Sequence, residues 1–229
     1  MKNEEIFSRI VSQRLSRQNR EYWGFKNFMD KISRSDRLLK NISKSVKDKI
    51  SIEEGLAQYV IADITAFEIF LRDTFFAIFR LCKNEQELMI KCSKLVENKF
   101  SIEDLVKIKY DNYEIPEIIM QYQNFQNLSS IEKVFSTLMG KKFFIGLNDR
   151  EFQSGGSTNI TFKLERNWYP ELEKYLDLRH QLTHDFDPNL KLDRKMIDKY
   201  HSNLLLFIVA ADEYIHKDFI EPNLRDEFI

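Results

Sequence analysis

The chain has 229 residues, of which 43% are hydrophobic and 31% are charged, so it can bury a substantial core and should be soluble. Six glycines and four prolines are few turn residues for this length, which argues against a sheet-rich fold and favours helices. The net charge of −1 conceals an asymmetry, because residues 1–50 hold thirteen Lys and Arg against six Asp and Glu, a net of +7, and the remainder carries −8.

The basic N-terminal segment is expected to form two or three amphipathic helices between residues 3 and 49. Its positive charge predicts one of three environments: an anionic partner, a docking surface on the acidic remainder of the chain, or solvent. A group of aromatic residues lies among the arginines and lysines: Tyr22, Trp23, Phe25 and Phe28. Such a group can stack on RNA bases, but it is more typical of the buried face of a helix, which is the interpretation we favour.

A long central helix is expected from about Ser51 to Cys82. Ser51-Ile-Glu-Glu54 has the pattern of a capping box, which begins a helix. Apolar residues then recur at helical spacing, at Leu56, Val60, Ile64, Phe67, Leu71, Phe75 and Ile78. Further apolar residues widen this stripe to most of the circumference, so the helix should be buried at the centre or partly covered by a second subunit.

Shorter helices are expected after this one. Residues 85–98 have helical spacing, Ser101-Ile-Glu-Asp104 begins a short helix, and residues 115–125 can form another. Ser129-Ser-Ile-Glu132 has the pattern of a further capping box, and Gly140 can end the helix that it begins. Residues 141–167, which include Gly155-Gly156, are expected to form an irregular loop or a small hairpin.

Two helices complete the expected fold. Pro170 suits the first turn of one helix, and Asp187-Pro188 should stop it. From Asp193 a last helix extends to about Ile215. The sequence therefore predicts one all-α domain over residues 1–229, a helical bundle in which residues 1–50 form a basic extension.

Several classes of protein and site are excluded by what the sequence lacks. Cys82 and Cys92 have no metal-binding spacing and fit a reducing cytoplasm. The first residues, MKNEEIF, place acids where a signal peptide needs an apolar core. The longest apolar run, Leu204–Ala211, is too short to cross a bilayer. We expect a cytoplasmic protein with no membrane partner, no metal and no cofactor.

The stretch DLRHQLTHDFDP, residues 177–188, is the strongest candidate site. Leu172, Tyr175, Leu176 and Leu182 define the inward stripe of its helix, and Arg179 falls inside that stripe. An inward arginine needs an acid or a hydrated cleft. Glu68 interrupts the apolar face of the central helix and is the best acid, although it can instead pair with Arg72, four residues on.

Two histidines follow the arginine. His184 lies five residues after Arg179, about 140° around a regular helix, whereas His180 and His184 share a face. Arg179 and His184 can converge if the helix frays after Leu182, or if two copies meet across a dimer axis. A histidine can transfer protons near neutral pH and an arginine can hold a phosphate, which together suffice for metal-free RNA cleavage through the ribose 2′-OH.

The segment LRHQLTHD resembles the signature of HEPN domains (higher eukaryotes and prokaryotes nucleotide-binding), an arginine and a histidine separated by four to six residues. ITAFEIFLRDTF, residues 64–75, is similar to the long early helix of that family, and WYPELEKYLDL, from Trp168, is similar to the helix that carries the motif. IEKVFSTLMG, from Ile131, resembles the preceding segment. The resemblance covers residues 51–218, a HEPN-like core, and leaves residues 1–50 without a counterpart.

The resemblance implies a function and a set of site residues. Many HEPN proteins are metal-independent endoribonucleases that act as toxins or in defence against phage, often as homodimers with facing motifs. Arg179 and His184 would then be the catalytic pair, His180 would assist, and Glu68 and Asp185 would support them. RNA would be the substrate, and an antitoxin or another defence protein would be a partner.

A non-catalytic alternative stays open, because other HEPN members bind nucleotides or protein partners without activity. Arg179 would then form a structural ion pair with Glu68, and the histidines would only cap the helix. A second match to the motif, Arg194 to His201, lies on one face of the last helix and is interpreted as a solvated stripe. Asp185 and Asp187 are interpreted as residues that stop a helix rather than metal ligands.

Overall fold

The computed structural model describes residues 3–18, 20, 23–45, 47–96, 99–154, 160–184 and 191–225, and these form an all-α fold with one small hairpin. The helices and strands are α1 (Asn3–Arg17), α2 (Gly24–Ser45), α3 (Lys49–Leu81), α4 (Glu85–Ser93), α5 (Ile102–Tyr110), α6 (Ile115–Gln121), α7 (Leu128–Met139), α8 (Phe143–Asn148), β1 (Phe152–Ser154), β2 (Ile160–Phe162), α9 (Trp168–His184) and α10 (Arg194–Ile215). A π-helical turn, His216–Ile220, and a 3₁₀ turn, Glu221–Asn223, follow α10.

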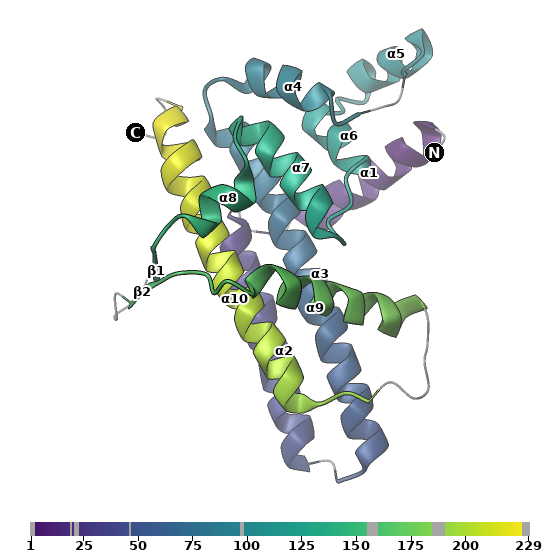
Figure 1. The fold of residues 1–229 in the computed structure, drawn as a ribbon. Helices are drawn as coiled ribbons and strands as arrows, with labels where there is room; N and C mark the ends of the chain where they lie inside the picture. The colour runs from purple at the N-terminus through teal and green to yellow at the C-terminus, as the bar shows by residue number, and fades with distance from the viewer. Residues whose placement is uncertain are drawn as a thin grey trace.

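The central helix of the fold is α3. Figure 1 shows α2 and α3 as a long antiparallel pair, with α10 alongside them and α9 crossing α3. Apolar side chains on nearly all sides of α3 are buried, among them Val60, Phe67, Phe70 and Phe75. A helix that is apolar around most of its circumference must be covered on every side, and α2, α9 and α10 provide that cover.

Two helices begin earlier than the sequence patterns predict. Asp48 caps α3, because its carboxylate accepts a hydrogen bond from the amide of Ser51 at 2.8 Å. Asn127 caps α7 in the same way, through a 2.8 Å bond from the amide of Ser130. The predicted capping boxes at Ser51 and Ser129 are therefore wrong, since an upstream Asp or Asn already satisfies the first free amides.

The predicted ends at residues 98 and 125 are wrong, because α4 ends at Ser93, where Leu95 and Val96 bond carbonyls only three residues back, and α6 ends at Gln121. Three other predicted helix ends are confirmed. Ser101 and Asp104 form a reciprocal capping box at the start of α5. Gly140 ends α7 with a φ of 70°, a left-handed conformation that glycine adopts without steric strain. Asp193 caps α10 through its side chain.

The segment 141–167 contains the predicted hairpin and an additional short helix. β1 pairs antiparallel with β2, with Phe152 opposite Phe162. The helix α8 was not expected; it buries Phe143, Phe144 and Leu147 in the core. Glu132 of α7 fixes its start by accepting the amide of Phe144 at 2.8 Å. Gly155 and Gly156 lie outside the described residues.

The basic N-terminal segment docks on the acidic remainder of the same chain. Arg14 and Arg17 both bond the carboxylate of Glu117, with nitrogen–oxygen distances of 2.8 and 2.5 Å. Arg20 approaches Asp73 at 3.4 Å. Both acids are buried, so their charges need these partners. Intramolecular docking, one of the three environments predicted for this segment, is therefore confirmed for these arginines.

The aromatic group in the basic segment faces the core, as the favoured interpretation predicted. Phe28 is buried in the main core cluster, and Trp23 and Phe25 pack against it. Tyr22 lies outside the described residues. Phe28 packs on Phe70 of α3, and the Trp23 ring lies against His216 after α10, so these rings are used in packing within the chain.

The two free cysteines are buried at the end of the molecule where α3 finishes. Cys82 forms an isolated backbone bridge with Leu224, and Arg225 bonds the carbonyl of Cys82 at 3.1 Å. Cys92 lies on α4. Burial raises the pKa of the Cys82 thiol to about 11 and that of the Cys92 thiol to about 12. None of the described helices has the length and apolar character needed to cross a membrane.

Candidate functional site

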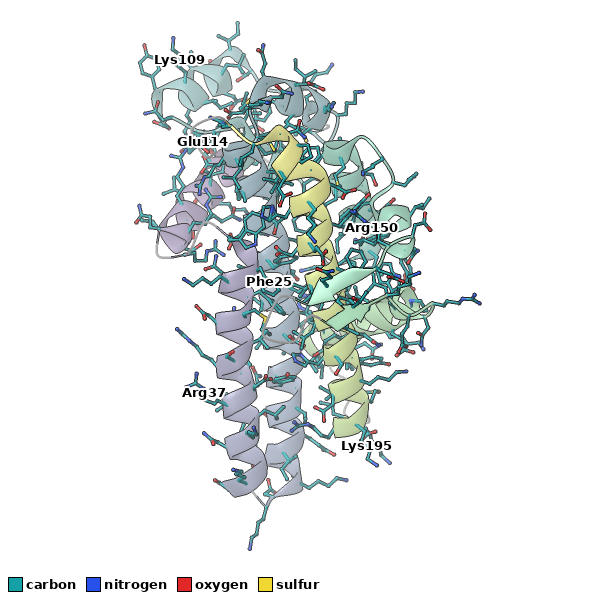
Figure 2. All side chains as sticks on the ribbon, turned by 90° about the vertical axis from the view of Figure 1, so that its left-hand side faces the viewer. Phe25, Arg37, Lys109, Glu114, Arg150 and Lys195 are labelled. Carbon is teal, nitrogen blue, oxygen red and sulfur yellow. The ribbon has the colours of Figure 1, made fainter. Side chains whose placement is uncertain are left out.

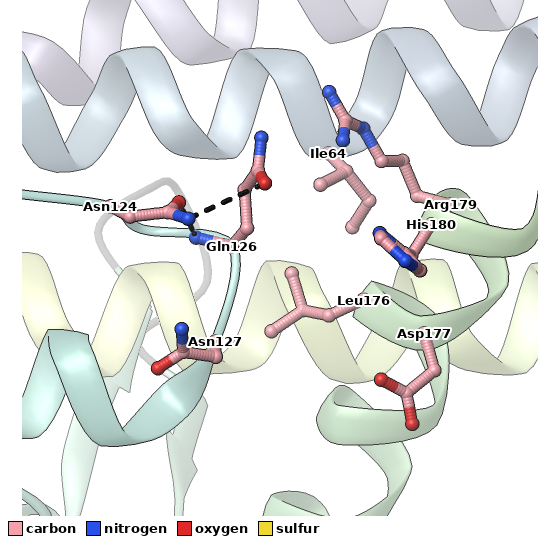
Figure 3. A pocket seen from close by; sticks show the side chains of 8 residues that line it. All are labelled: Ile64, Asn124, Gln126, Asn127, Leu176, Asp177, Arg179 and His180. Atoms are coloured by element: carbon pink, nitrogen blue, oxygen red, sulfur yellow. Dashed lines mark hydrogen bonds between the residues drawn. The ribbon is translucent and has the colours of Figure 1, made fainter. Parts of the chain in front are cut away.

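Arg179 lies on the inward side of α9, where the apolar pattern places it. Leu172, Tyr175 and Leu176 are buried on the same side of the helix and fix its rotation. The Arg179 side chain is 17% exposed and reaches from α9 toward α3 (Figure 3). A guanidinium in this position is neither fully hydrated nor fully buried, so its surroundings determine what it can bind.

Glu68 on α3 is the acid nearest to Arg179, as predicted. Its Oε1 lies 3.9 Å from an Arg179 Nη, at the outer limit of an ion pair. Within the described part of the chain, Arg179 Nε and Glu68 Oε1 are buried without a hydrogen-bond partner. Burial raises the pKa of Glu68, although the charges of Arg179 and Arg72 oppose that rise. The pair is loose, and donor capacity on Arg179 remains unused.

Arg179 faces a pocket of about 240 Å³. Its lining comes from α3, α9 and the loop between α6 and α7, and includes Ile64, Asn124, Gln126, Leu176, Arg179 and His180. Figure 3 shows Asn124 and Gln126 across the pocket from Arg179 and His180. Asn124 folds the loop by accepting the amide of Gln126 at 2.8 Å. Asn127 and Asp177 complete the lining, so an arginine, an imidazole and three amides share the hollow with one carboxylate. Arg179 is the group in it that can bind an anion by two-point contact.

The histidines lie at the exposed end of α9. Their ring centroids, in His180 and His184, are 4.9 Å apart. The helix continues through His184, so the fraying that we considered after Leu182 is wrong. The Thr183 hydroxyl, which donates to the carbonyls of Arg179 and His180 at 3.0 and 3.1 Å, holds this last turn. His184 therefore stays about 140° from Arg179 around the helix.

The structure thus joins some of the predicted site residues and separates others. Arg179 and His180 line one pocket, Glu68 contacts Arg179 from the neighbouring hollow, and His184 contacts His180 but faces solvent. Asp185, together with Asp187 and Pro188, lies outside the described residues. Within one chain, His180 is the imidazole beside the pocket.

A buried polar network below the pocket was missed. Asp63 of α3 is fully buried, and its Oδ2 accepts the Tyr175 hydroxyl at 2.6 Å and lies 2.8 Å from Nδ1 of His201. These contacts join α3, α9 and α10. The interpretation of Arg194 and His201 as a solvated stripe is wrong for His201, whose side chain is only 13% exposed, while Arg194 pairs with Asp198 at the surface.

A sequence signal for this network exists. His201 follows Ile197 by four residues and precedes Leu204 by three, which places it on the buried face of α10. Burial lowers the pKa of His201, but the hydrogen bond and charge of Asp63 outweigh burial and leave that pKa raised. The imidazole is thereby stabilised in its protonated form.

No metal-binding cluster of three or more His, Cys, Asp or Glu side chains is present within the described ranges. The candidate site combines Arg179, the two histidines and several amides with the carboxylates of Glu68 and Asp177. Its arginine can bind an anion and its imidazoles can transfer protons. No protein-family model, curated protein or solved structure matches this chain.

Proposed function

We propose that the protein is a metal-independent endoribonuclease whose site is formed by Arg179, His180 and His184. One observation carries the proposal: Arg179 lines a polar pocket with unused donor capacity, beside a pair of histidines 4.9 Å apart. A guanidinium can hold a phosphate by two-point contact, and imidazoles can move protons at neutral pH. The resemblance of LRHQLTHD to the HEPN motif supports the same reaction.

The reaction needs one base, one acid and a means to offset negative charge. A neutral histidine removes the proton from a ribose 2′-OH, whose oxygen then attacks the adjacent phosphorus. The bond from phosphorus to the 5′ oxygen breaks, and a protonated histidine supplies the proton that the leaving oxygen takes. Arg179 offsets the charge that develops on the phosphoryl oxygens. The products are a 2′,3′-cyclic phosphate and a 5′-hydroxyl, and DNA, which lacks the 2′-OH, is not cleaved.

Glu68 has a supporting role in this proposal. Its carboxylate contacts Arg179 from α3 and would orient the guanidinium. Because the contact is 3.9 Å long, a phosphate can compete for the remaining donors of Arg179. Asp185 stays a predicted supporting residue. A toxin or phage-defence role, and an antitoxin or other partner that restrains it, belong to the same proposal.

A homodimer completes the proposed site. His184 is exposed and lies about 140° from Arg179 around the helix, so within one chain its imidazole lies beside His180 rather than beside the Arg179 guanidinium. Two copies of α9 that meet near residue 184 would bring His184 of one chain to the pocket of the other. A two-fold axis would build both sites at once.

The test is to express the wild type, Arg179→Ala and His184→Ala and to map cleaved RNA and its end chemistry. We expect wild-type cleavage with 2′,3′-cyclic phosphate ends that persists in a metal chelator. Each substitution should reduce the rate at least about 100-fold, because His184→Ala removes an acid–base group and Arg179→Ala removes the group that offsets the developing charge. His216→Ala, an exposed histidine on another surface, is the matched control and should cleave normally.

Two results would contradict the proposal. Cleavage that persists in both variants, or that requires a divalent metal, would exclude this site or this mechanism. Absence of any cleavage, with Arg179→Ala destabilised by about 3–5 kcal/mol as expected for a broken buried ion pair, would favour a non-catalytic helical module that binds a nucleotide or a protein. Thermal melting of each purified variant separates these cases.

A further inference from the structure

A second polar hollow of about 300 Å³ adjoins the Arg179 pocket. Its lining includes Arg9 and Gln13 of α1, Glu68 and Arg72 of α3, and Asn124 and Gln126 of the α6–α7 loop. Asn124 and Gln126 line both hollows, and Glu68 lines this one while its carboxylate meets Arg179 of the other. The two hollows are therefore neighbouring sections of one polar groove.

We infer that this groove holds single-stranded RNA on one side of the cleaved bond, with Arg72 and Arg9 binding backbone phosphates beyond the one held by Arg179. The inference rests on the proposed function, since it extends the same substrate along the surface. It also assigns a role to α1, which lies outside the part of the chain that resembles a HEPN domain.

Arg72 is suited to a phosphate because its present bonds are weak. Its guanidinium donates to the carbonyls of Met120 and Gln123, both at 3.5 Å, the upper limit for a hydrogen bond. It also lies 5.8 Å from the centre of the Phe125 ring, which holds the planar group in place. Burial lowers the pKa of Arg72, and an anionic phosphate in the groove would counter that effect.

Arg9 contributes from the opposite wall of the groove. It precedes Gln13 by one helical turn on α1, so both side chains face the same hollow. Neighbouring arginines on α1 are used differently: Arg14 and Arg17 bond Glu117. Arg14 and Arg17 thus anchor α1 to the fold, whereas Arg9 lines the groove.

The wall formed by α1 is fixed to the rest of the groove. Gln121 donates a 2.8 Å hydrogen bond to the Gln13 side chain, directly beside the hollow. Glu117, one turn earlier on α6, holds Arg14 and Arg17. The groove holds three arginines and exposed amides against the two carboxylates of Glu68 and Asp177. Arginines spread over two hollows fit a flexible polyanion better than a single nucleotide, which one hollow could hold.

The test measures binding of RNA that cannot be cleaved. A fluorescent 2′-O-methyl oligonucleotide of about ten nucleotides, within the usual range of single-strand sites, is titrated into the wild type, Arg9→Ala and Arg72→Ala. Each variant should raise the Kd about tenfold and reduce the salt slope by about one, because one phosphate contact is lost. A 2′-O-methyl dinucleotide should lose less affinity, since it does not reach Arg9.

The control is Arg37→Ala, which removes the same charge from an exposed position on α2 far from the groove (Figure 2). It should bind both RNAs like the wild type. Arg72 is partly buried, so its replacement can disturb folding, whereas Arg9 is exposed. Arg9→Glu therefore tests the groove independently and should weaken oligonucleotide binding more than Arg9→Ala does. Melting curves verify that each variant is folded.

Different results overturn different claims. Oligonucleotide affinity that is unchanged in Arg9→Ala and Arg72→Ala, or reduced only as much as in Arg37→Ala, would exclude the groove even if the wild type cleaves RNA. Equal losses for the dinucleotide and the longer RNA would reduce the site to a nucleotide pocket and also overturn the inference. If Arg9→Ala and Arg72→Ala weaken oligonucleotide binding but the wild type never cleaves RNA, the proposed function is overturned and the groove is still supported as an RNA-binding surface.

Discussion

Asp63 places a carboxylate at a fully buried position of α3, and two polar groups from other helices bond one of its oxygens. Such a group is tolerated only when hydrogen bonds replace its lost hydration. Tyr175, one of the two partners, precedes Arg179 by one helical turn on α9. The bond from Tyr175 to Asp63 therefore sets the rotation of α9, which in turn directs Arg179 to the pocket.

The protonated His201 should make stability depend on pH. Its pKa in the folded protein is raised above the ordinary value of 6.5. The free energy of unfolding that the interaction of protonated His201 adds is therefore complete below pH 6.5 and is lost as pH rises through the raised pKa. We expect the urea midpoint of the wild type to fall through this window, whereas His201→Gln should show a smaller dependence there.

Other charged groups near His201 define the control measurements. Asp63, Asp36 and Asp198 all favour its protonated form. Burial raises the pKa of Asp212 to about 6, so this carboxyl titrates at a pH below the His201 window. Its ionisation also lowers stability as pH rises, but it does so before the His201 window begins. Identical pH profiles for the wild type and His201→Gln above pH 6.5 would show that His201 does not carry the dependence.

At the scale of elements, α1 is attached to the fold through one buried acid and a small apolar cluster. Glu117 is 2% exposed and bonds Arg14 and Arg17, and its carboxylate also accepts the amide of Glu114 at 3.0 Å. α1 also buries Ile6, Phe7 and Ile10 in a small apolar cluster with Ile118 of α6, and Phe7 stacks on Tyr113 with ring centroids 4.9 Å apart. The apolar contacts of α1 thus form a cluster separate from the main core that α2 enters, and the buried charge of Glu117 adds to them.

Glu117→Gln should loosen α1 without unfolding the core. The amide keeps the shape of the side chain but removes the charge that both arginines bond, which should cost about 1–3 kcal/mol. Hydrogen exchange should increase in residues 3–17 and stay unchanged in α3. An exchange increase spread over the whole molecule would mean instead that α1 and the core open together.

Sequence patterns predicted the long elements because their apolar spacing is sustained over many turns, as in α3 and α10. They failed where a distant contact decides the structure. The six residues of α8 are too few for a periodic signal, and the helix exists because Phe143 packs on Phe135 and Tyr214. Tertiary packing of this kind is invisible to local patterns.

The candidate site shows the same division. Arg179 was predicted because it occupies a position in an apolar stripe, and its pairing with Glu68 followed from a second interruption of the same kind. The prediction of a solvated His201 was wrong because it used the spacing from Arg194. The position of His201 between the buried residues Ile197 and Leu204 indicates the buried face of α10 instead. A polar residue inside an apolar stripe was the informative signal in each case.

At the scale of the whole molecule, the proposed homodimer predicts that two chains together form each active site. If Arg179 of one subunit works with His184 of the other, mixing Arg179→Ala with His184→Ala should restore activity. Random exchange makes half of the dimers mixed, and each has one intact site, so about one quarter of wild-type cleavage should return. A mixture as inactive as its components would place both residues of each site in one chain.

The buried thiols give this molecule two built-in reporters of its own opening. A thiol reacts as the thiolate, so Cys82 and Cys92, with pKa values raised to about 11 and about 12, should be nearly inert while folded. Their labelling would then require local or global exposure. Cys82 reports separation of the last residues from the end of α3, and Cys92 reports separation of α4 from its neighbours. The order in which they react would show which part of the fold opens first, with no engineered probe.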